Sequence, residues 1–458
     1  MTSYAQKQAD FIENLSYHGI PLEVIHRAKL CFLDMIGLCL FSSQLDFGKM
    51  MLEVVKEFHG SKESTIIGFG ESAPAPLAAL VNGTLAHGTE FCDTYHKGGV
   101  HLGACIVPAA LAIGEKKGVD GKTVITSAVA GIEIFARIAS VAPTEFHTRG
   151  FHPTSIFGTF GSTVTAAKIL NLNSDQIANA MGICGSQASG IFECVSDGSW
   201  VKRMHPGWSA HCGLIASSLA YKGFTGPRAV YEGRFGLFRS HIGEGNYNFD
   251  RLTEGLGNDW ETLTLVSKPY PCCGLSYSSM DCALHLKHKF NIDLIQVEEI
   301  HCMVNERIIN HVCEPSHIKY TPPTGYASQF SFPYAVALML IKEENLSVDD
   351  FSDEMIKDPQ ISHLAQKVKY SVIQESWEPK KLYGWVRIKM KDGKVYEDKI
   401  YPTKASLNCP TTDDEIREKF RRNASKVLSE SRTLELMKNI ENLEESKDIR
   451  KLTNLCSQ

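Results

Sequence analysis

The chain has 458 residues, more than one hydrophobic core usually organises, so its length predicts two domains. Hydrophobic residues make up 43% and charged residues 22% of the sequence, which excludes a disordered or collagen-like chain. The formal charge of -5 gives no general attraction to phosphate backbones or anionic lipid, so neither nucleic acid nor a membrane surface is expected as a partner.

The 14 cysteines are scattered along the sequence without a CxxC pair. Since no signal peptide is recognisable, this pattern is typical of a protein in the reducing cytoplasm rather than of a disulfide framework. The most apolar early stretch, residues 30–41, contains Asp34 and is too short to span a bilayer. It predicts a buried helix, and no other segment predicts a membrane span.

Helical patterns dominate the sequence from its N-terminus to about Ser267. Apolar residues recur there at helical spacing, and glycines separate the segments. Residues 108–117 predict one helix with Pro108 in its first turn, and residues 121–138 predict another with a wide apolar stripe. Residues 1–267 are therefore expected to form the first part of a helical domain.

The pattern changes after Pro269-Tyr270-Pro271. Residues 298–305 and 368–374 contain short β-like runs, and residues 385–401 alternate around Lys391-Asp392-Gly393-Lys394, which is a strong hairpin signal. This composition predicts a smaller α+β domain at residues 268–405, called the lid domain below.

Helical character returns at Thr411. Thr411 and Thr412 precede Asp413, Asp414 and Glu415, as hydroxyl residues do at a capped helix start. The simplest interpretation is that residues 406–458 rejoin the helical domain.

Four polar clusters flanked by glycine place titratable side chains where a helical core would have aliphatic ones. The densest spans residues 86–103 and holds two carboxylates, three imidazoles and a lysine within fifteen residues. Such a set can contain oppositely tuned acids and bases, as proton abstraction beside a carboxylate requires. The same residues would also suit helix caps or a hydrated loop. The five-residue spacing of His96 and His101 differs from that of a helical zinc site.

The other three clusters are smaller. Residues 149–158 lead into a helix expected to begin near Thr159, and a helix N-terminus behind His152 is a natural seat for a carboxylate. The third cluster spans residues 200–211 and the fourth residues 267–274, and their lysines, Lys202 and Lys268, are candidate carboxylate binders. Taken singly, a hydrogen-bonded structural histidine or a solvated lysine is the common alternative. No Walker A sequence or GxGxxG motif accompanies the clusters, which favours chemistry without a cofactor.

Taken together and in order, these motifs resemble the MmgE/PrpD family, whose members include 2-methylcitrate dehydratases and cis-aconitate decarboxylases. The resemblance covers nearly the whole chain. It rests on Asn82-Gly83 with Ala86-His87, Asp93-Thr94 to His101, Gly150-Phe151-His152, Gly223-Phe224-Thr225-Gly226-Pro227, Lys268-Pro269-Tyr270-Pro271 and Gln329-Phe330-Ser331-Phe332-Pro333-Tyr334.

The resemblance implies a mainly α fold in which a large all-helical domain, built from both chain ends, carries an inserted α+β lid domain. It also implies a homodimer, and a metal-independent active site between the domains without a cofactor. By motif, the catalytic residues are expected at His101, His152, Glu90, Asp93 and Tyr334, and the substrate-binding residues at Thr94, Lys202 and Lys268.

The first loop departs from the family pattern. Relatives typically read Leu-Asp-Phe-Asp-Asp-Thr where this chain reads Thr89-Glu90-Phe91-Cys92-Asp93-Thr94, so Glu90 replaces the first Asp and Cys92 the second. The loop that follows is one residue longer than in the decarboxylase, a form associated with less characterised relatives that include an iminodisuccinate epimerase. These differences affect the reach of the side chains and the fit of the substrate.

Our hypothesis from the sequence is that Lys202, Lys268 and the helix N-terminus behind His152 hold the carboxylates of a small polycarboxylate. His101 moves the α proton, or His152 exchanges roles with it, while Glu90 or Asp93 orients the imidazole. Thr94 hydrogen-bonds the substrate, and Tyr334 assists as an acid from the lid domain.

Loss of hydroxide would then make the protein a hydro-lyase of the 2-methylcitrate dehydratase type. The same groups would permit decarboxylation of cis-aconitate or epimerisation of a dicarboxylate such as iminodisuccinate. A non-catalytic binding dimer is the alternative of another class.

Overall fold

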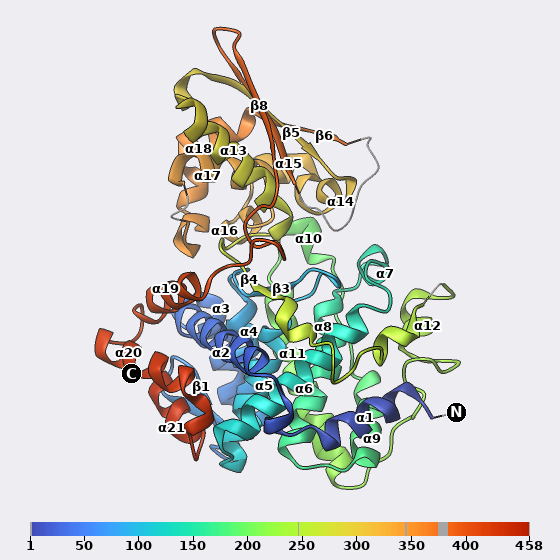
Figure 1. Ribbon diagram of the computed structural model, residues 1–458. Helices are drawn as coiled ribbons and strands as arrows, with labels where there is room; N and C mark the ends of the chain where they lie inside the picture. The colour runs from blue at the N-terminus through green and yellow to red at the C-terminus, as the bar shows by residue number, and fades with distance from the viewer. Residues whose placement is uncertain (1, 246, 344–345, 374–382, 458) are drawn as a thin grey trace.

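The computed structural model of the protein describes residues 2–245, 247–343, 346–373 and 383–457. Figure 1 shows a large helical body with a smaller domain above it. Each part has its own hydrophobic core: one contains residues from Ala5 to Leu265 and again from Ile416 to Cys456, and the other runs from Val266 to Ala405. The predicted mainly α fold, with a helical domain from both chain ends and an α+β lid domain, is confirmed.

The first part of the helical domain consists of helices joined mostly by short loops. They are α1 (Tyr4–Asn14), α2 (Leu22–Ser42), α3 (Asp46–Glu57), α4 (Ala75–His87), α5 (Gly103–Lys117), α6 (Gly121–Ala139), α7 (Glu145–Thr148), α8 (Pro153–Ile169), α9 (Ser174–Gly185), α10 (Cys194–Asp197), α11 (Val201–Tyr221) and α12 (Leu237–Ile242).

Small residues allow the central helices α4, α5, α6, α8 and α11 to pack closely. Gly83 and Gly207 meet where α4 and α11 cross, and a Cβ atom on Gly83 would lie 2.6 Å from the Cα atom of Gly207. Since α4 ends at His87 and α11 begins just before Lys202, this crossing brings the two side chains together.

Three helices begin earlier than the sequence pattern predicts. The carbonyl of Leu102 accepts hydrogen bonds from the amides of Cys105 and Ile106, so α5 starts at Gly103 and Pro108 lies inside the helix instead of in its first turn. Helix α8 starts at Pro153 rather than near Thr159, because proline at the first helical position has a preset φ. Helix α11 extends back to Val201, although the apolar pattern of the sequence predicts a helix only over residues 214–221. His152 and Lys202 therefore lie at helix N-termini.

Two short strand pairs that were not expected lie within the helical domain: β1 (Ser64–Ile66) with β2 (Glu71–Ala73), and β3 (Asp93–Tyr95) with β4 (Leu265–Ser267). In the second pair Asp93 is opposite Ser267 and Thr94 is opposite Val266, in antiparallel register. This ladder fixes the first polar loop beside the segment that leads into the lid domain.

The lid domain is a four-stranded sheet with helices packed against it. Its strands, β5 (Val297–Val304), β6 (Val368–Val372), β7 (Gly384–Met390) and β8 (Val395–Ile400), lie in the order β6-β5-β7-β8. The β5–β6 pair is parallel, and the β5–β7 and β7–β8 pairs are antiparallel. The predicted strands and the hairpin around Asp392-Gly393 are confirmed, although Gln374 of the second predicted strand lies outside the described residues.

The helices α13 (Tyr277–Phe290) and α17 (Phe332–Lys342) pack against each other and against strands of this sheet. The remaining lid helices are shorter: α14 (Glu306–Ile308), α15 (Ser316–Tyr320), α16 (Gly325–Ser328) and α18 (Pro359–Gln366), with a π-helical turn at Ile309–Cys313.

The C-terminal helices return to the helical domain. They are α19 (Asp413–Ala424), α20 (Glu430–Glu441) and α21 (Arg450–Thr453), and Figure 1 shows them beside the N-terminal helices. Thr412 caps α19 in a capping box with Glu415, as predicted. Phe420 of α19 packs against Gly37 of α2, so the tail completes the large core.

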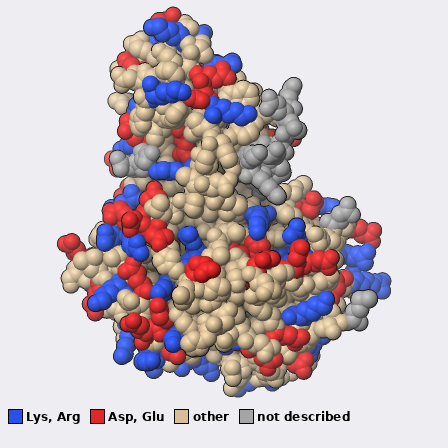
Figure 2. Space-filling model, in the orientation of Figure 1, with Lys and Arg blue, Asp and Glu red and all other residues tan. Residues whose placement is uncertain are grey.

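Acidic and basic side chains are interspersed on the face drawn in Figure 2, without a broad field of one sign. None of the helices in the described ranges combines the length and the apolar character that crossing a membrane requires.

We predict that Gly207→Ala lowers the free energy of unfolding by about 1–3 kcal/mol, although alanine alone favours a helix over glycine by about 1 kcal/mol. The added Cβ atom would lie 2.1 Å from the Leu80 carbonyl oxygen, so α4 and α11 must separate. Urea unfolding measures the change. Gly19→Ala is the control, since its Cβ atom would meet only the Ser16 hydroxyl at 3.6 Å. Unchanged or increased stability of the Gly207 variant would contradict the close crossing.

Candidate active site

A cavity of about 200 Å³ lies between the two domains, and the polar loop residues of the sequence converge on it. The helical domain supplies most of its charged groups, while the lid domain contributes a more apolar wall with Leu275, Ile308 and Phe330. Of the residues predicted for the site, those that line the cavity are Glu90, Thr94, His101, His152, Lys202 and Lys268.

Glu90 joins the two predicted lysines into one buried chain of charges. Its carboxylate accepts a hydrogen bond from the Lys202 ammonium through Oε1, and Oε2 lies 3.4 Å from the Lys268 Nζ atom. The Lys268 Nζ atom also donates to the main-chain oxygen of Glu90 at 2.9 Å. All three side chains are buried, with 1–4% of each residue exposed. Burial alone would raise the pKa of Glu90, but the two ammonium groups lower it to about 2.

The backbone at Glu90 has φ = 54°, in the left-handed region that non-glycine residues rarely adopt. Such conformations persist where surrounding contacts over-determine them, and they cluster at functional sites. At Glu90 these contacts come from the two lysines and from the side-chain amide of Gln329. That amide donates a hydrogen bond at 2.8 Å to the carbonyl of Thr89, the residue before Glu90. The turn aims the carboxylate at the lysines.

His101 is held in a single neutral tautomer. Its Nδ1 atom lies 2.6 Å from the Asp93 carbonyl oxygen, and because a carbonyl only accepts, Nδ1 carries the proton. The other ring nitrogen, Nε2, is then the basic one. Burial, followed by the charges of Lys268 and Lys202, lowers the pKa of His101, so the imidazole is neutral at neutral pH.

His152 forms a second imidazole pair in the cavity wall. Its Nδ1 atom lies 2.8 Å from Nδ1 of His205, so one ring donates and the other accepts. Burial, then Lys202, lowers the pKa of His205 to about 4, and burial with the neighbouring His205 lowers the pKa of His152. The hydroxyls that follow are used internally: Thr154 accepts from the His101 amide at 3.3 Å. His152 itself is thus the group of this cluster that faces the cavity.

Asp93 lies behind the cavity and acts on it through its main chain. Its carboxylate accepts from the Gly103 amide at 2.8 Å, while its carbonyl oxygen holds His101. Burial, then the nearby carboxylate of Asp34, raises the pKa of Asp93 to about 7. A role for Asp93 in orienting His101 agrees with this geometry; its side chain is not among the described residues that line the cavity.

Tyr334 does not lie where the sequence predicted a lid-side acid. Its hydroxyl donates to the carbonyl of Asp350 at 2.8 Å, and its ring packs against Phe351 inside the lid domain. The tyrosine beside the charged chain is Tyr326 of α16, whose hydroxyl lies 3.5 Å from Oε1 of Glu90. Ser331 caps α17, so Tyr334 falls in its first turn and points into the lid core.

Several other side chains of the site were not predicted individually. His87 accepts from the Lys202 ammonium at 3.3 Å through Nε2, and its Nδ1 atom lies 3.2 Å from the Cys92 thiol. His87 and Cys92 both lie in the first polar cluster of the sequence, so the sequence contained a signal for them. His205 belongs to the third polar cluster of the sequence. Phe192, just before α10, and Tyr326, in α16, carry no comparable local signal, because only tertiary packing brings them to the cavity and to Glu90.

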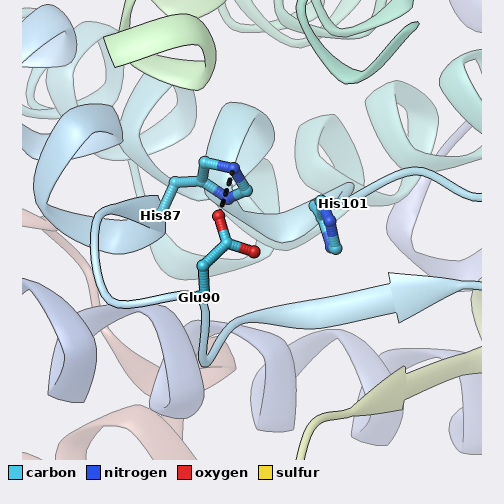
Figure 3. A group of neighbouring side chains, drawn as sticks. All are labelled: His87, Glu90 and His101. Atoms are coloured by element: carbon cyan, nitrogen blue, oxygen red, sulfur yellow. Dashed lines mark ion pairs between the residues drawn. The ribbon is translucent and has the colours of Figure 1, made fainter. Parts of the chain in front are cut away.

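Figure 3 shows His87, Glu90 and His101 close together, with ligand atoms within 4.8 Å of one another. This donor set resembles a metal site. However, the Lys202 ammonium contacts both Glu90 and His87, and Lys268 also contacts Glu90. Two ammonium groups on the same donors oppose a divalent cation and favour an anion instead.

Family comparison agrees with this arrangement along the chain. Residues 6–250 match the MmgE/PrpD N-terminal domain, and residues 270–445 match the MmgE/PrpD C-terminal domain. The chain belongs to the MmgE/PrpD family. The resemblance seen in the sequence motifs is therefore confirmed.

Named relatives of this family member are cis-aconitate decarboxylases. The protein of that name from Aspergillus terreus is 26% identical over 468 residues, covering 97% of this chain and 94% of the relative. The Homo sapiens cis-aconitate decarboxylase is 26% identical over 470 residues, covering 99% and 95%. These relatives support an enzyme of the lyase class, and they do not confirm a hydro-lyase.

We predict that Asp93→Asn becomes more stable relative to the wild type as pH rises from about 4 to about 7, with no further change above that. The unfolded carboxyl ionises near its ordinary value, whereas the folded one stays protonated to about pH 7. The wild type therefore loses stability over this window, and asparagine does not. Urea unfolding at several pH values measures the difference.

Asp448→Asn is the control for this titration. Arg450 lowers the pKa of that partly exposed carboxylate, so the stability of this variant relative to the wild type should not rise over the same pH window. A flat difference between Asp93→Asn and the wild type would show that Asp93 ionises normally.

Proposed function

We propose that the protein is a metal-independent lyase without a cofactor that removes a proton from the carbon beside a carboxylate of a small di- or tricarboxylate. The observation that carries the proposal is His101, a neutral imidazole with Nδ1 committed to the Asp93 carbonyl. It lines the same cavity as Lys202 and Lys268, which suit a carboxylate. A base and an anion-binding pair thus share one enclosed space.

The charges of the cavity match an anionic substrate. Two buried ammonium groups and the carboxylate of Glu90 leave a net charge of about one positive unit when the histidines are neutral. When the α proton leaves, negative charge develops on the carboxylate oxygens, and ammonium groups already in place stabilise it without reorganisation. Glu90 orients both lysines, and Thr94 on the cavity wall offers a hydroxyl to the substrate.

Dehydration is the reaction that the two histidines favour. After proton abstraction, the hydroxyl on the adjacent carbon leaves with a proton, so the site needs a base and a proton donor. His101 is the base in this proposal, and His152, hydrogen-bonded to His205, supplies the proton in its protonated form. Substrate carboxylates bound beside the ring would favour that form by raising its pKa. This describes a hydro-lyase of the 2-methylcitrate dehydratase type.

Decarboxylation of a cis-aconitate-like substrate is the second candidate, favoured by the relatives that carry that name. Loss of carbon dioxide leaves a carbanion that must receive a proton, so this reaction needs His101 or His152 in its protonated form. Substrate carboxylates bound near the rings would raise their pKa toward that form. Glu90 and Cys92, where relatives carry aspartate, argue against copying the relatives' substrate without a test.

Proton NMR of the chelator-treated enzyme in deuterated water tests the proposal with 2-methylcitrate, citrate, cis-aconitate and a racemisable dicarboxylate. New vinylic signals from a citrate would establish dehydration, and itaconate from cis-aconitate would establish decarboxylation. Deuterium exchange without a new skeleton would indicate epimerisation. Unchanged spectra with all four substrates would refute the proposed reaction and favour a non-catalytic binding protein.

We predict that His101→Asn lowers kcat by about 10²–10⁴-fold on the active substrate, because general acid–base catalysis contributes about that much. KM should change little, since the lysines that bind carboxylates remain. Initial rates measured by NMR give both constants. His285→Asn, an exposed lid residue paired with Asp398, is the control. Unchanged turnover in the His101 variant would remove this residue from the mechanism.

A further inference from the structure

A second buried charge pair lies directly behind the cavity, formed by residues from the two ends of the chain. Lys419 of α19 has its Nζ atom 2.8 Å from Oδ1 of Asp34, which belongs to α2. Both residues are buried, with 5% and 3% exposed. Neither lines the cavity among the described residues, and the proposed chemistry uses neither. Burying such a pair is costly, so its contacts need an explanation.

The Lys419 ammonium is bonded to both segments that carry the charged chain of the site. It donates to the carbonyl of Phe91, the residue after Glu90, at 2.5 Å, and to the carbonyl of Lys268 at 3.1 Å. It also lies 3.1 Å from the Ser267 hydroxyl, and 3.9 Å above the Phe91 ring. One cation therefore joins the Glu90 turn to the segment that enters the lid domain.

Asp34 balances this cation and completes the junction. Its Oδ2 atom accepts a hydrogen bond from the Ser267 hydroxyl at 2.5 Å. Thr411, just before α19, donates to the Ser267 carbonyl at 2.6 Å. The antiparallel ladder places Ser267 opposite Asp93. The ladder alone aligns the two strands, but the turn at Glu90 and the Lys268 backbone lie beyond its ends, and Lys419 connects them.

We propose that Lys419, neutralised by Asp34, is a positioning residue that sets the spacing of Lys202, Glu90 and Lys268 in the cavity. The Lys268 ammonium contacts two groups of Glu90, the side-chain carboxylate and the main-chain oxygen. A small shift between the two segments therefore breaks the chain of charges. The C-terminal part of the chain is thus needed for the geometry of the site as well as for the core. The inference rests on the proposed function for its kinetic readout.

The test compares Lys419→Met with the double variant Asp34→Asn/Lys419→Met. The single variant leaves Asp34 buried and unpaired, so a large loss of thermal stability is expected. The double variant removes both charges, and its melting temperature should recover most of that loss. Its kcat/KM should nevertheless stay at least tenfold below the wild type, since no donor joins the Phe91 and Lys268 carbonyls. Recovery of stability and kcat/KM together would overturn the positioning role.

Lys168→Met is the matched control. Lys168 also donates to two main-chain carbonyls, those of Ile12 and Glu13, at 2.7 and 2.9 Å. It lies 16 residues beyond His152 along α8, about 24 Å away at the helical rise. Its loss should lower stability without lowering kcat/KM.

Hydrogen–deuterium exchange tests the inference without any substrate. In the double variant, amides of residues 89–94 and 265–268 should exchange at least tenfold faster than in the wild type or in Lys168→Met. Unchanged exchange in these segments would overturn the inference even if the enzyme were active. A wild type that is inactive on every substrate would refute only the proposed reaction, because the exchange result stands independently.

Discussion

Burying two ammonium groups away from water costs several kcal/mol each unless a carboxylate compensates them, and Glu90 supplies that carboxylate. The arrangement around the cavity depends on this requirement. The left-handed turn at Glu90 directs the side chain at Lys202 and Lys268. Burial, reinforced by the same lysines, lowers the pKa of His87 and of His101, so a neutral imidazole base lies beside an anion-binding pair. The same three charged side chains therefore balance one another and provide the setting for the proposed chemistry.

The groups that meet in the cavity come from segments far apart in the sequence. The end of α4 and the start of α11 carry His87 and Lys202, and their spacing follows from the Gly83–Gly207 crossing. Lys268 arrives through the β3–β4 ladder at the entrance to the lid domain. The C-terminal helix α19 then packs behind this junction, where Lys419 donates to the carbonyls of Phe91 and Lys268. Small residues, a short ladder and a buried ion pair thus position the charges.

Much of the local structure was predictable because it depends on neighbours in the sequence. The Asp392-Gly393 hairpin and the Thr412 capping box are set by turn and cap chemistry within a few residues. Helix starts were less predictable: α8 begins at Pro153 because the His152 carbonyl already accepts from Ser155 and Ile156, a contact that apolar periodicity does not reveal. Motif order identified the six predicted residues that line the cavity, since motifs mark positions regardless of the path between them.

The sequence by itself determined the mainly α class, the inserted α+β domain, the return of the C-terminus and the charged residues of the site. Only the tertiary structure decided which groups act together. It placed Tyr326 rather than Tyr334 beside Glu90, set Asp93 behind His101, and brought Lys419 to Lys268. The physical reason is range: periodicity, caps and turns are interactions between near neighbours, whereas the partner of a buried charge or hydroxyl depends on how distant helices pack.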